Sequence, residues 1–325
     1  SSIIEYDRWV TNYPAHSALP QAEFDRAWLN HQAGNRARAF QLFTNYVVRF
    51  PTNRLAPVAQ KWIADHQFQS GKFAEAEQGY RRLFENTNLL ANARGLEWEA
   101  RLNAGRSAFF RQEHAAAELL LASVINATNA PVAEQARAEF FLGDVAADQT
   151  QRTPTNLLDA LPHYQRVANE MIGSPLHPLA WGRVGDCYLQ LGNLGPAADA
   201  YRAVTELSGT DVTTRSQAGL GLARVLEEQA ALAGETEERE ELLQQSLSQC
   251  MNIVFGDNLR SASEKMAPFW VKEAGLMAGH LAGRLGRADQ ERSVYSRLAK
   301  ELPDMPLWQA KLDALKVGPE ASKAP

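Results

Sequence analysis

Apolar and small residues recur along this chain at intervals of three and four, the spacing of one face of an α-helix. The first such stripe consists of Ile3, Tyr6, Trp9 and Val10, and similar stripes continue as far as Leu315. A long alternation of apolar and polar residues, which is typical of half-buried strands, does not occur. The pattern therefore predicts an all-α chain.

The helical stripes are interrupted at a regular interval. An aromatic residue follows four glycines at a distance of nine: Phe43 after Gly34, Tyr80 after Gly71, Tyr201 after Gly192 and Tyr295 after Gly286. Pro51 and Pro303 stand seventeen residues after Gly34 and Gly286, and the interval from Gly34 to Gly71 is 37 residues. Periods of this length are the sequence signature of repeat proteins built from stacked units.

Each recurring position has a physical use in a pair of antiparallel helices. Glycine ends the first helix in a left-handed conformation that side chains with a Cβ resist. A small residue seven positions earlier, such as Ala27, lets the two helix backbones approach closely. The aromatic residue of the second helix fills the space toward the next pair, and the proline ends that helix. One pair cannot bury its apolar stripe alone, so neighbouring pairs must stack.

These positions resemble those of the tetratricopeptide repeat (TPR) over nearly the whole chain. The unit 178–208 carries the pattern at Trp181, Gly185, Tyr188, Gly192, Ala197 and Tyr201. The 37-residue spacing, with segments such as RFPTNRLAPVAQ, is similar to a branch of periplasmic and outer-membrane-associated bacterial proteins. That branch includes the Tol–Pal coordinator and the outer-membrane assembly lipoprotein. The resemblance implies a right-handed superhelical solenoid on the periplasmic side of a bacterial cell envelope, or otherwise in the cytoplasm.

We expect a single solenoid over residues 1–316, with about seven helix pairs between a partial N-terminal helix and a C-terminal capping helix. The pairs span 18–50, 55–86, 91–126, 132–170, 176–208, 212–254 and 266–302, and the cap spans 306–316. Residues 2–12 read as the second helix of a repeat whose first helix is absent, so further repeats are expected upstream. Gln112 stands at the turn position of the third pair, and the insertion QTQRTPTNLL (149–158) interrupts the fourth. Residues 317–325 have the composition of a poorly anchored tail.

Composition and motifs give no support for an enzyme, a cofactor or a metal site. The formal charge of −5 gives no electrostatic reason to expect nucleic acid, and no apolar run is long enough to span a bilayer. No two of the seven histidines stand three to five residues apart, and the common phosphate-binding, hydrolase and redox motifs are missing. Two cysteines in a chain of this length do not form a disulfide framework.

The first helices of stacked pairs line the concave side of a solenoid, where a protein or peptide partner would bind. Counting from the turn residues, the side chains that we expect in this groove are Phe24, Trp28, His31, Phe68, Arg106, Phe109, Phe110 and Arg137. Exposed aromatic residues mixed with arginine are typical of protein-binding surfaces. The alternative is that several of these aromatic side chains pack inside the solenoid.

The sequence leaves three functions open. The first is a non-enzymatic scaffold that binds a partner protein or peptide in the concave groove. The second is a structural subunit of a large envelope complex, suggested by the unpaired N-terminal helix and the insertion at 149–158. The third is the recognition domain of a longer enzyme or regulator. Fold analogy alone does not choose among them.

Overall fold

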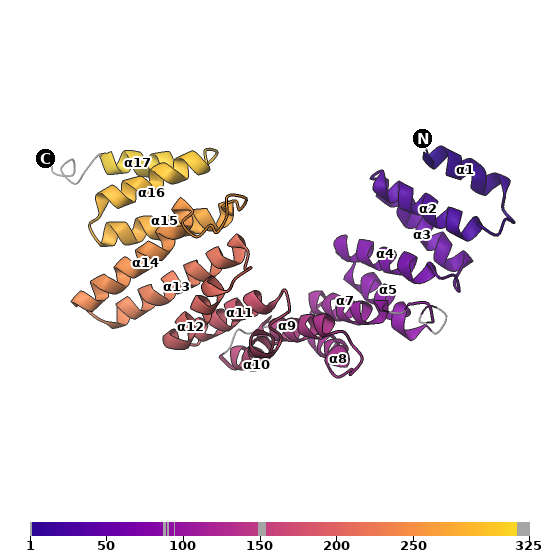
Figure 1. Ribbon diagram of the computed structural model, residues 1–325, viewed down its shortest axis with the longest axis horizontal. Helices are drawn as coiled ribbons and strands as arrows, with labels where there is room; N and C mark the ends of the chain where they lie inside the picture. The colour runs from indigo at the N-terminus through magenta and orange to yellow at the C-terminus, as the bar shows by residue number, and fades with distance from the viewer. Residues whose placement is uncertain (1, 87–88, 90, 94, 149–153, 317–325) are drawn as a thin grey trace. The chain divides into compact units, whose positions relative to one another are not determined.

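The computed structural model describes residues 2–86, 89, 91–93, 95–148 and 154–316. Within these ranges the chain forms sixteen α-helices and no strand (Figure 1). The all-α prediction is therefore confirmed. The insertion segment 149–153 and the tail 317–325 lie outside the described residues.

Contacts between Cα atoms divide the chain into two compact units, unit 1 from Ser1 to Arg152 and unit 2 from Thr153 to Pro325. Unit 1 contains α1 (Ser2–Asn12), α2 (Leu19–Gln32), α3 (Arg36–Arg49), α4 (Ala56–Gln69), α5 (Phe73–Glu85), α7 (Leu96–Phe110), α8 (His114–Ile125) and α9 (Val132–Asp148). Unit 2 contains α10 (Pro154–Glu170), α11 (His177–Gln190), α12 (Leu194–Glu206), α13 (Val212–Leu232), α14 (Glu237–Phe255), α15 (Pro268–Arg284), α16 (Ala288–Glu301) and α17 (Leu307–Lys316).

Within each unit, every helix packs against the next one along the chain. Alternate helices also touch, as α4 with α7 and α7 with α9 in unit 1, and α11 with α13 and α13 with α15 in unit 2. This is the arrangement of stacked antiparallel helix pairs. The predicted solenoid of helix pairs is confirmed as the architecture of each unit.

The turns between the paired helices use the left-handed backbone conformation. Gly34, Gly71, Gly192 and Gly286 have φ angles of 80°, 73°, 75° and 67°. Gln112 has a φ of 64° and is the one non-glycine residue with positive φ among the described residues. The third pair therefore makes the same turn as the others without the residue that adopts it most readily.

The cores of both units are built on the aromatic residues of the second helices. Tyr80 is buried in unit 1, and Tyr201 and Tyr295 are buried in unit 2. The ring of Tyr201 lies between α11 and α13, against Gly185 on one helix and Gly221 on the other. A Cβ placed on either glycine would approach the ring to 2.7 and 2.5 Å, so these positions admit no side chain without movement of Tyr201.

The last helix, α17, closes the C-terminal core. Trp308 is fully buried, and Leu312 and Leu315 are partly buried against the same cluster of α13–α16 residues. The helix Leu307–Lys316 thus covers the end of this core, where we expected a capping helix.

Candidate partner-binding face

The first helices of the pairs in unit 1 are α2, α4, α7 and α9, and side-chain contacts join each to the next. His31 of α2 meets Trp62 of α4 with ring centroids 5.3 Å apart. Lys61 of α4 forms an ion pair with Glu99 of α7, 3.1 Å between Nζ and Oε1. Arg106 of α7 lies over the ring of Phe141 of α9. We call the surface that these four helices form the first-helix face of unit 1.

Aromatic and imidazole rings form a continuous chain from α2 to α4. Phe24 stacks on Trp28, whose ring lies 5.4 Å from that of His31. His31 contacts Trp62, and Trp62 stacks almost parallel on His66 at 5.3 Å. Rigid rings that support one another lose little conformational freedom when a partner covers them. This row of rings is therefore suited to binding a partner.

His66 is the titratable end of this chain of rings. Burial lowers the pKa of His66 below its ordinary value of 6.5, and the positive charges of Arg36 and Lys72 act in the same direction. The imidazole on Trp62 therefore stays neutral at pH 7.

A second aromatic cluster joins the C-terminal ends of α4 and α7. Phe68 meets Phe110 edge-on at 5.5 Å, and Phe73 stacks on Phe110 at 5.0 Å. Phe109 contacts both Phe110 and His114. Phe110 itself keeps 47% of its surface exposed and therefore presents an apolar ring to solvent.

Arg106 lies next to this cluster between two rings. Its guanidinium is 5.2 Å from the centroid of Phe68 and 4.8 Å from that of Phe141. Burial lowers the pKa of Arg106, with the nearby positive charge of Arg137 acting in the same direction. The Nη1 of Arg106 donates a hydrogen bond to Oδ1 of Asn103 at 3.3 Å, and the negative charge of Asp144 acts against the lowering of the pKa. The Nε of Arg106 is buried without a hydrogen-bond partner. The side chain is thus held in place by the two rings and by Asn103.

The polar part of the face is held by a hydrogen bond that recurs in unit 2. The Tyr80 hydroxyl donates to Oδ1 of Asp65 at 2.7 Å, and the Tyr201 hydroxyl donates to Oδ1 of Asp186 at the same distance. Tyrosine and aspartate occupy equivalent positions in the two pairs, fifteen residues apart. Burial is the main cause that raises the pKa of both tyrosines. We interpret this bond as a structural element of the repeat, because it fixes the aspartate on the first helix.

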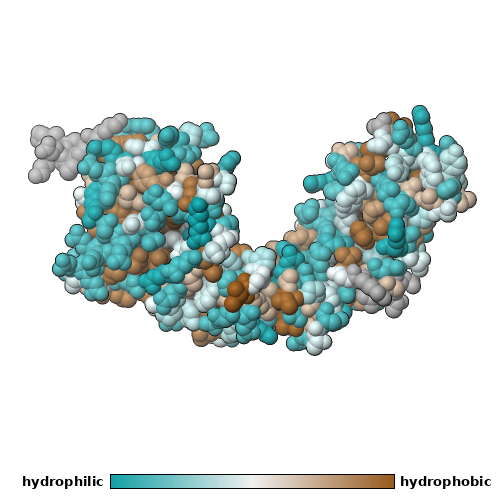
Figure 2. Space-filling model, in the orientation of Figure 1, coloured by the Kyte–Doolittle hydropathy of each residue, from teal (hydrophilic) through white to brown (hydrophobic). Residues whose placement is uncertain are grey.

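The predicted groove residues divide into two groups by exposure. Trp28 (39%) and Phe110 are exposed, and Arg137 is an exposed side chain that bonds to Glu134. Phe24, His31, Phe68, Arg106 and Phe109 are partly buried. Phe24, Phe68 and Phe109 pack against the cores, as the alternative reading of the sequence had allowed. In the view of Figure 2, apolar side chains of unit 1 are exposed as separate patches among hydrophilic ones.

The predicted repeat residues lie at the turns and in the cores. The four turn glycines have positive φ, and Tyr80, Tyr201 and Tyr295 are buried. Trp181 is partly buried against the core cluster of α12 and α13.

Trp62 is a central member of the face that the sequence reading missed. It stands nine residues before Gly71, as Asp25 stands nine residues before Gly34. This offset relates the two positions as equivalent sites of consecutive pairs, but it does not show that their side chains share a surface.

Neither a metal cluster nor an exposed thiol is found among the described residues. Among them no cluster of three or more His, Cys, Asp or Glu side chains could hold a metal ion. Both cysteines are buried, and burial raises the pKa of the Cys250 thiol to about 12, so this thiol stays protonated. No helix in the described ranges is long and apolar enough to cross a membrane.

Comparison with known proteins relates this chain to others by fold. No family model and no curated protein matches it. The C-terminal part of a TPR repeat-containing protein from Cytophaga hutchinsonii superposes with a TM-score of 0.58 and 11% identity, covering 89% of this chain and 99% of that one. A signal transduction ATPase with numerous domains and a tetratricopeptide repeat sensor, from Pyrococcus horikoshii, has a TM-score of 0.58 and 12% identity, covering 97% of this chain and 47% of that one. At such low identity these similarities establish a tetratricopeptide-like helical fold.

Proposed function

We propose that this chain is a non-enzymatic protein-interaction scaffold, and that the first-helix face of unit 1 binds a segment of a partner protein. The observation that carries this proposal is the exposure of Trp28 and Phe110 on two supported aromatic clusters of one face. The tetratricopeptide-like fold supports it, because stacked helix pairs provide extended surfaces for binding.

The residue types on this face, and the rings that support them, favour the binding of a protein segment. Tryptophan, tyrosine and arginine contribute most of the binding free energy at protein interfaces. Trp28 rests on Phe24, and Phe110 rests on Phe68 and Phe73. Arg106 adds hydrogen-bond donors beside an apolar ring. A partner segment with apolar side chains would thus find anchors whose conformations are already fixed.

Selection of binding peptides from a random library, followed by affinity measurement, tests the proposal. The double substitution Trp28→Ala/Phe110→Ala should weaken the selected peptides by about tenfold or more, the effect expected of central anchors. The matched control is Val48→Ala/Leu119→Ala, which truncates two side chains that are more exposed (79% and 73%) on the second helices α3 and α8. Equal loss in both variants, or no loss in the first, would remove the assignment of this face.

We also propose the periplasmic side of a bacterial cell envelope as the location of the protein. The support is the resemblance of the 37-residue spacing and of RFPTNRLAPVAQ to envelope proteins. Fractionation of the native cells tests it, and recovery of the protein with cytoplasmic markers would contradict it.

A further inference from the structure

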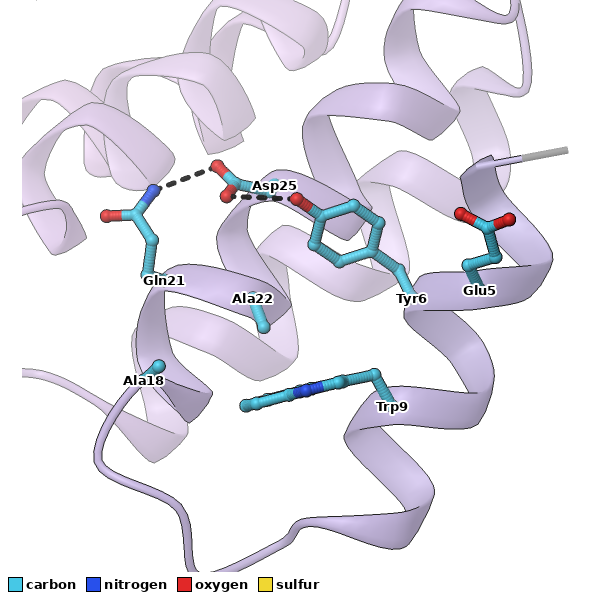
Figure 3. Close-up of a pocket in the computed structure, with 7 residues that line it drawn as sticks. All are labelled: Glu5, Tyr6, Trp9, Ala18, Gln21, Ala22 and Asp25. Atoms are coloured by element: carbon cyan, nitrogen blue, oxygen red, sulfur yellow. Dashed lines mark hydrogen bonds between the residues drawn. The ribbon is translucent and has the colours of Figure 1, made fainter.

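The cavities of the two units differ in the chemistry of their walls. Between α1 and α2, Trp9 lies beside the small side chains of Ala18 and Ala22, which gives that cavity an apolar wall (Figure 3). A cavity of about 250 Å³ in unit 2 lies among α12, α13, α14 and the segment 256–260 that follows α14. Most of the side chains that line it are polar, and we call it the amide cavity because three of them are side-chain amides: Gln249, Asn252 and Asn258.

The segment after α14 is fastened to α13 by a buried arginine. Arg215 is only 4% exposed, and its Nε and Nη2 donate to the main-chain oxygen of Asn258 at 3.2 and 3.0 Å. Nη2 also donates to Oε2 of Glu264 at 2.6 Å, and Nη1 donates to the main-chain oxygen of Thr210. The wall that Asn258 provides is therefore fixed before any ligand binds.

The orientation of the Asn258 amide follows from its hydrogen-bond partner. The hydroxyl of Ser216 donates its one hydrogen to the main-chain oxygen of Val212 at 2.7 Å, so it can only accept from Asn258. The Nδ2 of Asn258 lies 2.8 Å from that hydroxyl and is therefore the donor. The Oδ1 of Asn258 is buried and has no hydrogen-bond partner among the described residues. A buried acceptor is costly without a donor, so this oxygen favours a ligand that supplies one.

The two amides of α14 add both donors and acceptors to the cavity. Gln249 and Asn252 stand three residues apart and line the cavity from the same side of the helix. Each side-chain amide offers an oxygen acceptor and two N–H donors, and neither has a hydrogen-bond partner within the described ranges. A carboxamide group has the same combination of acceptor and donors. It can therefore pair with these amides and also donate to Asn258.

The charged residues of the cavity do not favour an ion. Arg215, Asp257 and Arg260 line it, and the charge of Arg215 is compensated by Glu264. Asp257 and Arg260 are exposed and carry opposite charges. The charged residues that flank this region in the sequence are exposed and do not line the cavity: Glu206, Asp211 and Lys265. One carboxylate and one guanidinium thus remain, so a neutral ligand fits better than a cation or an anion.

We propose that the amide cavity binds a carboxamide group, which either free glutamine or asparagine or the same side chains on a protein segment can supply. Its nitrogen donates to Oδ1 of Asn258, and its oxygen and second N–H pair with the amides of Gln249 and Asn252. Apolar surface for the methylene groups next to the carboxamide comes from Gly219, Ile253 and Leu259. The volume lies just below the range of about 300–1,000 Å³ for drug-sized ligands, which suits a ligand of amino-acid size.

This site is separate from the one on which the proposed function depends. The amide cavity belongs to unit 2 and uses none of the residues of the first-helix face of unit 1. Loss of carboxamide binding would leave the Trp28 and Phe110 test unaffected. Loss of peptide binding at that face would likewise leave the amide cavity unaffected, so the two proposals fail independently.

Titration of the intact chain, followed by NMR of the side-chain ¹⁵NH₂ signals of Gln249, Asn252 and Asn258, tests the proposal. One set of probes is acetyl-Ala-Gln-Ala-methylamide with its glutamate analogue, which lacks the N–H donors, and its norleucine analogue, which lacks donors and acceptor. The other set is free L-glutamine and free L-glutamate. A glutamine probe should shift the three signals with saturation, and its analogues should bind about fivefold more weakly or worse.

The two sets of probes distinguish the sources of the carboxamide. Binding of the glutamine peptide but not of free glutamine would identify a protein segment as the source, and the reverse would identify the free amino acid. Binding of either glutamine probe, or of both, supports the site. If neither glutamine probe shifts the signals, or if the glutamate or norleucine analogue binds equally well, the cavity holds water only and the proposal is wrong.

A substitution on α14 tests the same site from the side of the protein. Gln249→Met keeps the length of the side chain and removes its amide, so it should weaken the glutamine probe by about fivefold. Gln245→Met is the matched control, because Gln245 is exposed, lies one turn earlier on α14 and does not line the cavity. Unchanged affinity in the Gln249→Met variant, or equal losses in both variants, would overturn the proposal.

Discussion

At the residue scale, the turn of the third pair shows how backbone conformation and residue type can disagree. Gln112 adopts the φ of the turn glycines, and nothing in its side chain relieves the cost of the left-handed region for a residue with a Cβ. The spacing of the repeat had placed a turn at this residue despite the missing glycine. The fold of the neighbouring helices therefore imposes the conformation.

Gln112→Gly should raise the free energy of unfolding by about 1 kcal/mol, because glycine adopts the left-handed conformation without steric cost. Chemical denaturation measures the change. Gln69→Gly, at the end of α4, is the control and should lower the free energy of unfolding by about 0.5 to 1 kcal/mol. A lower free energy of unfolding in the Gln112→Gly variant would show that the glutamine side chain stabilises the fold through an interaction of its own.

Also at this scale, the row of rings on α2 and α4 should make the stability of the protein depend on pH. The folded-state pKa of His66 is lowered from 6.5, so the unfolded chain binds the proton more readily. The stability that this provides is complete above pH 6.5 and is lost as the pH falls through the folded-state pKa. His66→Phe keeps a ring on Trp62 and removes the titration.

The free energy of unfolding of the wild-type protein should therefore fall more between pH 7 and pH 5 than that of the His66→Phe variant. Denaturant titrations at both pH values provide the comparison. Parallel losses in the two proteins would mean that His66 is not the group responsible.

Residue spacing could not decide which aromatic side chains face solvent. Phe109 and Phe110 are adjacent in the sequence, and the first packs on the core while the second is exposed. A shift of one residue turns a helix by about 100°, so a register read from turn positions alone does not resolve this difference.

At the scale of the helix, two glycines inside α11 allow the effect of side-chain packing to be distinguished from that of helix propensity. Gly182 and Gly185 lie three residues apart on one helix. An added Cβ at Gly182 meets no atom within 4 Å, whereas at Gly185 it would meet the ring of Tyr201. The repeat pattern predicted a small residue at Gly185 for close approach, and the structure supplies the reason.

Gly185→Ala should lower the free energy of unfolding by about 1 to 3 kcal/mol, the usual cost of overpacking. Gly182→Ala should raise it by about 0.5 to 1 kcal/mol, because alanine loses less backbone entropy in a helix than glycine. Thermal or denaturant unfolding of the two variants gives opposite signs. Two changes of the same sign would contradict the packing of Tyr201 against α11.

At the scale of the whole molecule, local contacts explain why the sequence predicted the architecture well. Each helix packs mainly against its neighbours in the chain, so spacing along the sequence translates directly into stacking. The division into two units falls within QTQRTPTNLL, the segment that interrupts the repeat spacing. The repeat pattern had expected one array over residues 1–316. The sequence predicted the function less directly than the architecture, because the same fold supports many binding surfaces.

Photo-crosslinking in the native cells tests most directly whether the first-helix face of unit 1 binds a partner protein. Benzoylphenylalanine is placed singly at position 28 or 110 on the first-helix face of unit 1, and at 48 or 119 on the second helices. Positions 28 and 110 should crosslink to the same partner protein, and positions 48 and 119 should not. Crosslinks to that partner from positions 48 and 119 alone, or none from 28 and 110, would contradict it.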